Sequence, residues 1–104
     1  MAEKRMLPRE ITDVVLGIAE KFTPDKIYLF SNKRGPMGKT SGFKLCVIMD
    51  CEDRDEIQRE IYRGIDSEVP YDIVLYTPEE WSELTERKGS FAQKVFETGV
   101  LVHE

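Results

Sequence analysis

The chain has little cysteine and little histidine, and these shortages exclude several kinds of site. Two of its 104 residues are cysteines and one is a histidine. Cys46 and Cys51 are not spaced as in any common metal or redox motif. We expect both thiols to be reduced, with Cys46 buried in an apolar run and Cys51 partly exposed. His103 stands one residue from the end of the sequence, and we expect it on the surface rather than in the role of a base.

Long apolar runs are also missing. None approaches the roughly 20 residues that a membrane helix needs. The charged segment 1–5 is not followed by the apolar stretch of a signal peptide. We therefore expect a cytoplasmic protein without membrane association. The length of 104 residues, with no internal repeat or linker, predicts a single domain over residues 1–104.

The charge is acidic overall but unevenly distributed. The formal net charge is −5, which does not favour general binding to nucleic acid. However, the segment 31–44 holds four of the 15 basic residues and none of the 20 acidic ones. These four are Lys33, Arg34, Lys39 and Lys44. The sequence therefore predicts a local basic loop on an acidic body.

Apolar residues recur at helical spacing in some segments and form short continuous runs in others. Helices are expected over residues 8–21, 53–65 and 90–97, the last with Phe91, Val95 and Phe96 facing inward. A further short helix should begin at Thr77 and Pro78, with Glu80 closing a capping box. Strands are expected over residues 27–30, 43–49, 71–76 and 100–102, with a polar, glycine-rich loop over 31–42. This order predicts an α/β (α+β) fold, a small mixed sheet with helices packed on it. The strand at 43–49 is apolar on both faces, so both faces should be covered.

The order of these segments carries a family resemblance. A short strand ends at Phe30, Ser31-Asn32 and a basic loop follow, and a second strand begins near Gly42. This layout resembles the signature region of the DNA polymerase beta-like nucleotidyltransferases in their minimal prokaryotic form. In that family the first strand ends in Phe-Gly-Ser and the second opens with Asp-x-Asp. Residues 71–80 and 89–102 resemble the later strand, helix and closing segments of the family, so the layout matches over nearly the whole chain. The resemblance implies a nucleotidyltransferase-like fold.

The residues that would carry the chemistry depart from this pattern. Ser31 and Asn32 stand where the family has Gly and Ser, Gly42 and Lys44 stand where it has the paired aspartates, and only Asp72 matches a family carboxylate. The reaction needs two or three carboxylates to hold Mg²⁺ and align the triphosphate. We therefore expect no intact catalytic site, no metal site and no cofactor, with Mg²⁺ and ATP relevant only if activity survives. Asp72 is then a remnant, and we expect it to pair with Lys44 on a neighbouring strand.

A second motif lies in the basic segment. Residues 35–41 end in Gly-Lys-Thr-Ser, as a phosphate-binding P-loop does, but Lys33 occupies the position of the first glycine and a strand follows instead of a helix. We therefore do not expect a P-loop. Its glycines could still turn backbone N–H groups towards an anion, and the alternative is a mobile hairpin tip with solvated lysines. The phosphate-binding candidates are Ser31, Asn32, Lys33, Arg34, Lys39 and Lys44.

The resemblance also implies a partner. Minimal domains of the family are often paired with a small helical protein called HEPN in toxin–antitoxin systems. We predict a non-catalytic nucleotidyltransferase-like domain that binds a protein partner. The alternatives are a nucleotide- or phosphate-binding module through residues 31–44, a weakly active Mg²⁺-dependent nucleotidyltransferase, and a homo-oligomer built through an exposed sheet edge.

Overall fold

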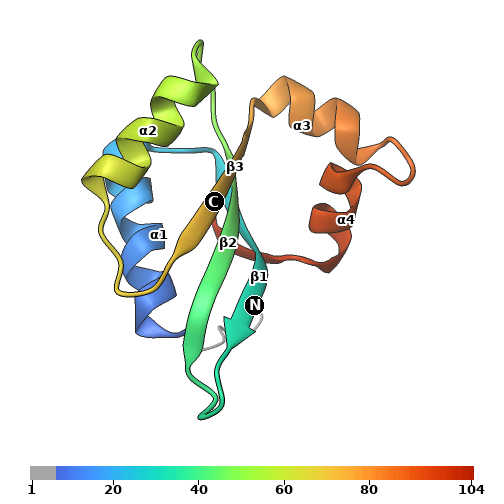
Figure 1. The fold of residues 1–104 in the computed structure, drawn as a ribbon. Helices are drawn as coiled ribbons and strands as arrows, with labels where there is room; N and C mark the ends of the chain where they lie inside the picture. The colour runs from blue at the N-terminus through green and yellow to red at the C-terminus, as the bar shows by residue number, and fades with distance from the viewer. Residues whose placement is uncertain (1–6) are drawn as a thin grey trace.

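A computed structural model describes residues 7–104 of the chain. Helices and strands are interspersed along the sequence, and both kinds of element are short (Figure 1). In chain order they are α1 (Arg9–Phe22), β1 (Lys26–Arg34), β2 (Thr40–Ile48), α2 (Arg54–Gly64), β3 (Tyr71–Tyr76), α3 (Pro78–Thr85), α4 (Phe91–Thr98) and β4 (Val100–His103). No helix of this described part is long and apolar enough to pass through a membrane.

The strands form one four-stranded sheet in the order β3-β2-β1-β4. β1 pairs antiparallel with both β2 and β4, whereas β2 and β3 run parallel. α1 and α2 lie on one side of the sheet, and α3 and α4 lie on the other (Figure 1). The fold is therefore a small mixed sheet with helices packed on it, as predicted from the order of the elements.

β2 is buried on both faces. Phe43, Leu45 and Val47 belong to the core that the sheet forms with α1 and α2. Cys46 and Ile48 belong to a second, smaller core that includes Trp81, Ala92 and Val95 of α3 and α4. The expectation that this strand is covered on both faces is confirmed.

The first hairpin differs from the prediction. Residues 31–34 and 40–42 are strand, so the expected loop over 31–42 is wrong, and the turn covers only residues 35–39. The backbone N–H of Gly35 donates to the carbonyl of Lys39 at 2.7 Å, and that of Gly38 donates to the carbonyl of Gly35 at 3.0 Å. Gly38 has a φ of +79°, which favours glycine. Pairing with β2 supplies the hydrogen bonds that make these polar residues a strand.

The buried face of α4 also differs from the prediction. Phe91 and Phe96 were expected to face inward, but they are 45% and 52% exposed. Val95 is buried as expected, and Ala92 takes the other buried position. Phe91 packs edge-on against Phe30, with ring centroids 5.2 Å apart. Both phenylalanines of α4 lie at the side of the contact between this helix and the sheet. A small alanine at the centre lets α4 approach the sheet closely.

The corner between α4 and β4 depends on Gly99. A Cβ atom at this position would lie 2.6 Å from the carbonyl oxygen of Val95 and 3.2 Å from that of Leu29. Real Cβ atoms do not approach a backbone oxygen so closely. Glycine therefore lets the chain pass directly from the helix into the edge strand.

A polar junction joins the starts of α2 and α3. The Thr77 hydroxyl accepts from the backbone N–H of Glu80, and the Glu80 carboxylate accepts from the backbone N–H of Thr77, which confirms the predicted capping box. Arg54 donates to the same carboxylate at 2.7 Å and to the carbonyl of Leu75 at 3.2 Å. The hydrogen bond from Thr77, followed by the one from Arg54, lowers the pKa of Glu80.

This junction predicts a pH-dependent effect of Glu80→Gln. A carboxyl group whose pKa is lowered by folding stabilises the protein above its unfolded pKa of about 4.3, and this contribution is lost as the pH falls through the folded pKa. The variant should therefore unfold more easily than the wild type at pH 7, and the difference should shrink at acidic pH. Urea unfolding at both pH values measures this, with Glu79→Gln in the same helical turn as the control. A difference that is constant with pH would contradict the assignment.

Candidate functional site

The three positions that the family resemblance assigns to carboxylates, Gly42, Lys44 and Asp72, lie on one face of the sheet. Lys44 and Asp72 are direct partners in the parallel pairing of β2 and β3. Gly42 precedes Lys44 by two residues and shares its face, because successive residues of a strand alternate between faces. Ser31 is paired with Lys44 across the hairpin. Gly42 itself is buried, and we call the surface formed by Phe30, Ser31, Lys44 and Asp72 the open sheet face.

This surface lies on the side of α3 and α4, but these helices cover only part of it. The β1–β2 hairpin extends beyond them (Figure 1). Lys44 is half-buried and Asp72 is exposed. A β-bulge between Leu29 and Ser31 lies at the boundary between the covered and the open parts. The bulge adds one residue to β1, so Phe30 and Ser31 both lie on the open side.

The register agrees with the expected neighbourhood of Lys44 and Asp72, but the expected ion pair is not formed. The salt bridges found in residues 7–104 join Arg54 to Glu80 and three exposed pairs of residues close in sequence, and none joins Lys44 to Asp72. An exposed carboxylate remains well hydrated in water, so it gains little from fixing a flexible lysine. The two charges therefore face each other across neighbouring strands without direct contact.

The three positions that the resemblance assigns to carboxylates hold one acid. Asp72 is that acid, and Lys44, its partner on β2, carries a positive charge. Within residues 7–104, no three His, Cys, Asp or Glu side chains gather closely enough to hold a metal ion. The usual alignment of a triphosphate by two or more carboxylates is not available at this face.

The phosphate-binding candidates divide into separate groups. Ser31, Lys33 and Lys44 lie on the open side, whereas Asn32 is paired with the buried Phe43 and its side-chain oxygen accepts from the Thr40 hydroxyl at 3.2 Å. Arg34 and Lys39 are exposed at the end of the hairpin. The N–H groups of Gly35 and Gly38 are used inside the turn. These two groups therefore do not turn towards an anion, and the residues that remain for an anion are exposed basic side chains.

Cys46 offers no nucleophile on the side of α3 and α4. Burial raises the pKa of the Cys46 thiol to about 12, so the reactive thiolate is not formed near neutral pH. Cys51 is half-buried and unpaired among the described residues. The expected burial of Cys46 and partial exposure of Cys51 are confirmed.

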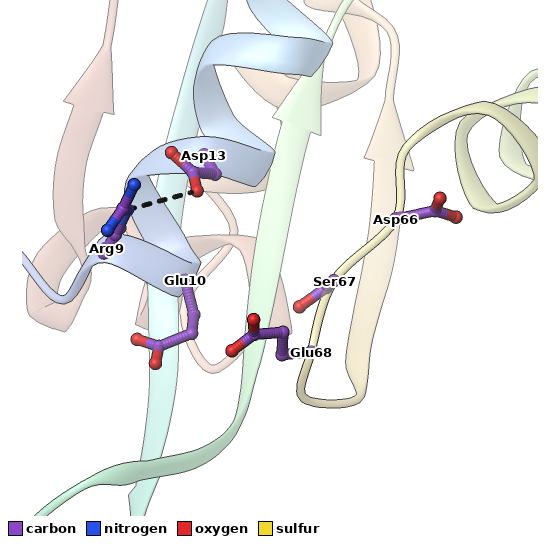
Figure 2. Close-up of a pocket in the computed structure, with 6 residues that line it drawn as sticks. All are labelled: Arg9, Glu10, Asp13, Asp66, Ser67 and Glu68. Atoms are coloured by element: carbon purple, nitrogen blue, oxygen red, sulfur yellow. Dashed lines mark ion pairs between the residues drawn. The ribbon is translucent and has the colours of Figure 1, made fainter.

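The structure also contains a pocket that the sequence did not indicate. It has a volume of about 580 Å³ and lies between the start of α1 and the segment before β3 (Figure 2). Arg9, Glu10, Asp13, Asp66, Ser67 and Glu68 line it. Four of these six are acidic, and Arg9 is 3.9 Å from Asp13. The acidic lining does not suit a phosphate, and none of the phosphate-binding candidates contributes to it.

Comparison with known proteins adds no relative. No protein family model matches the chain, and no curated protein or solved structure matches it with significance. The arguments for function therefore rest on the residues and their arrangement.

The register predicts that a charge reversal at Lys44 is harmful and can be repaired. Lys44→Glu places two acids opposite each other, which should lower the free energy of unfolding by about 0.2–1 kcal/mol. Lys44→Glu combined with Asp72→Lys should recover most of this loss. Chemical denaturation of the two variants and of the exposed control Lys39→Glu measures the effect. Equal stability of the single and double variants would show that the two side chains do not interact.

Proposed function

We propose that this chain is a non-catalytic nucleotidyltransferase-like domain that acts by binding a protein partner. One observation supports this most: the three positions that would carry the family's carboxylates share one sheet face and hold Gly42, Lys44 and Asp72. A domain that retains this arrangement with only one of the three acids has a surface to offer rather than a metal-dependent reaction.

The composition of the open sheet face suits a protein partner. Phe91 borders it through its contact with Phe30, and this ring is 45% exposed. Ser31, Lys44 and Asp72 provide polar and charged groups of both signs beside the aromatic pair. An aromatic anchor surrounded by polar groups is the usual arrangement of a protein interface. A small helical HEPN-type protein of a prokaryotic toxin–antitoxin pair is the partner that the family resemblance implies.

The partner is tested by affinity capture from the source organism, followed by a titration of the purified partner. Phe91→Asp should weaken its binding by at least about tenfold, because a buried aromatic anchor is worth more than 1.4 kcal/mol. Leu16→Asp is the matched control, since Leu16 is an apolar residue with 52% exposure on the α1 side. Failure to capture a partner, or an equal loss in both variants, would contradict the proposal.

A second candidate function is the binding of a nucleotide or phosphate without chemistry. Lys33, Arg34 and Lys39 are exposed, and none takes part in the salt bridges of residues 7–104. Their charges are therefore available to an anion, although the N–H groups of Gly35 and Gly38 are used inside the turn.

For this second function, ATP affinity should fall when Lys33 and Lys39 are both changed to Ala. It should also decrease with salt and be independent of Mg²⁺, because only side-chain charges contribute. Calorimetric titration measures this, with Lys88→Ala and Lys94→Ala, two exposed lysines elsewhere, as a matched control. An unchanged affinity would exclude the hairpin. Labelling by a nucleoside triphosphate that needs Mg²⁺ and is lost in Asp72→Ala would instead reveal transferase activity.

A further inference from the structure

The two edges of the sheet differ in how the rest of the fold covers them. β3 forms one edge and β4 forms the other. An edge strand leaves alternate backbone N–H and C=O groups without a partner in the sheet, and these groups can pair with a strand from another chain. The described residues protect the edge at β3 and leave the edge at β4 open.

Three side chains of α2 satisfy the outer edge of β3. Arg54, Gln58 and Tyr62 follow one another at spacings of four, so they lie along one side of the helix. Gln58 donates to the carbonyl of Ile73 at 2.7 Å, and the N–H of Ile73 donates to the Tyr62 hydroxyl at 2.8 Å. Arg54 donates to the carbonyl of Leu75 at 3.2 Å. A second strand cannot pair here without displacing this row.

β4 has no such protection in residues 7–104. The backbone of Val100–His103 makes hydrogen bonds within the ladder with β1, and no described side chain donates to it or accepts from it. The strand is short and its pairing with β1 has a register shift between Ile27 and Tyr28, but it contains no proline and no Lys, Arg, Asp or Glu that would block an edge. Each of the other three strands carries at least one charged residue.

Apolar side chains flank this edge on both faces of the sheet. Val100, which pairs with Leu29, is 50% exposed, and Leu101, which pairs with Tyr28, is 40% exposed. Phe96 lies against Tyr28 with ring centroids 6.4 Å apart, and its ring is 52% exposed. An added strand would cover these three side chains and would also satisfy the outward backbone groups.

We infer that β4 pairs antiparallel with β4 of a second copy of this chain, which joins two four-stranded sheets into one. Antiparallel pairing of a strand with itself is self-complementary about a two-fold axis. The uncharged strand also explains why the second copy can dock here. Two molecules of net charge −5 repel one another. A contact through residues 100–103 brings no Lys, Arg, Asp or Glu of this strand into the interface. This inference is independent of the proposed function, since the open sheet face lies elsewhere.

The test is the oligomeric state of the full chain by sedimentation equilibrium. The wild type should form a concentration-dependent dimer with a dissociation constant below about 1 mM, which is the range of weak association expected from a small interface. Leu101→Lys and, on the other face, Val100→Lys should each raise the dissociation constant at least about tenfold, because lysine blocks edge pairing. Leu16 is a leucine of similar exposure on α1, and Leu16→Lys should leave the dissociation constant unchanged. Circular dichroism confirms that the variants are folded.

Hydrogen exchange of the wild type gives a second readout that needs no variant. Amide protons of residues 100–103 that face outward should exchange more slowly as the protein concentration rises, while those of β3 should not change. A chain that stays monomeric at 1 mM, or that dimerises equally well with Leu101→Lys, would overturn the inference. Loss of the dimer with retained binding of the protein partner in Leu101→Lys would separate this edge from the proposed function.

Discussion

β2 cannot leave either of its faces in water, and the arrangement of the domain follows from this constraint. Phe43, Leu45 and Val47 require α1 and α2 on one side, and Cys46 and Ile48 require α3 and α4 on the other. The second pair of helices has only eight residues each, so it covers the part of β2 around Cys46 and Ile48. Beyond them, Lys44 is half-buried and its partner Asp72 on β3 is exposed. The open sheet face therefore results from an imbalance in length between a long central strand and two short helices.

Much of this fold could be predicted because its signals are local. The capping box of Thr77 and Glu80, and the helical spacing of Ile11, Val14 and Ile18, are visible in a few consecutive residues. The extension of β1 through the polar residues 31–34 could not be predicted, because only pairing with β2 makes them a strand. The prediction of the buried face of α4 was wrong for a similar reason. Hydrophobicity favoured Phe91 over Ala92, whereas close packing on the sheet favours the smaller side chain.

The site shows the same division between local and distant information. Strand alternation and the order of the elements were enough to predict that Lys44 and Asp72 would be neighbours. Their lack of direct contact depends on hydration and side-chain freedom, which no pattern of residue types encodes. The acidic pocket could not be predicted either, since Glu10 and Glu68 come from segments far apart in the sequence. The three residues that protect β3 are spaced along one face of a helix: Arg54, Gln58 and Tyr62. In the sequence, however, they cannot be told from an ordinary solvated helix face.

The strand order also affects when the sheet can be completed. β1 pairs with β2 through a tight hairpin, which needs only neighbouring residues, but its other edge pairs with β4 at residues 100–103. During synthesis, which proceeds from the N-terminus, the hairpin can form early, while the second edge of β1 has no partner until this last strand emerges. Contacts between segments so distant in sequence also form slowly. Ile27 and Leu29 would spend that interval beside an unpaired edge, so a nascent chain is most exposed to mispairing just before its final strand closes the sheet.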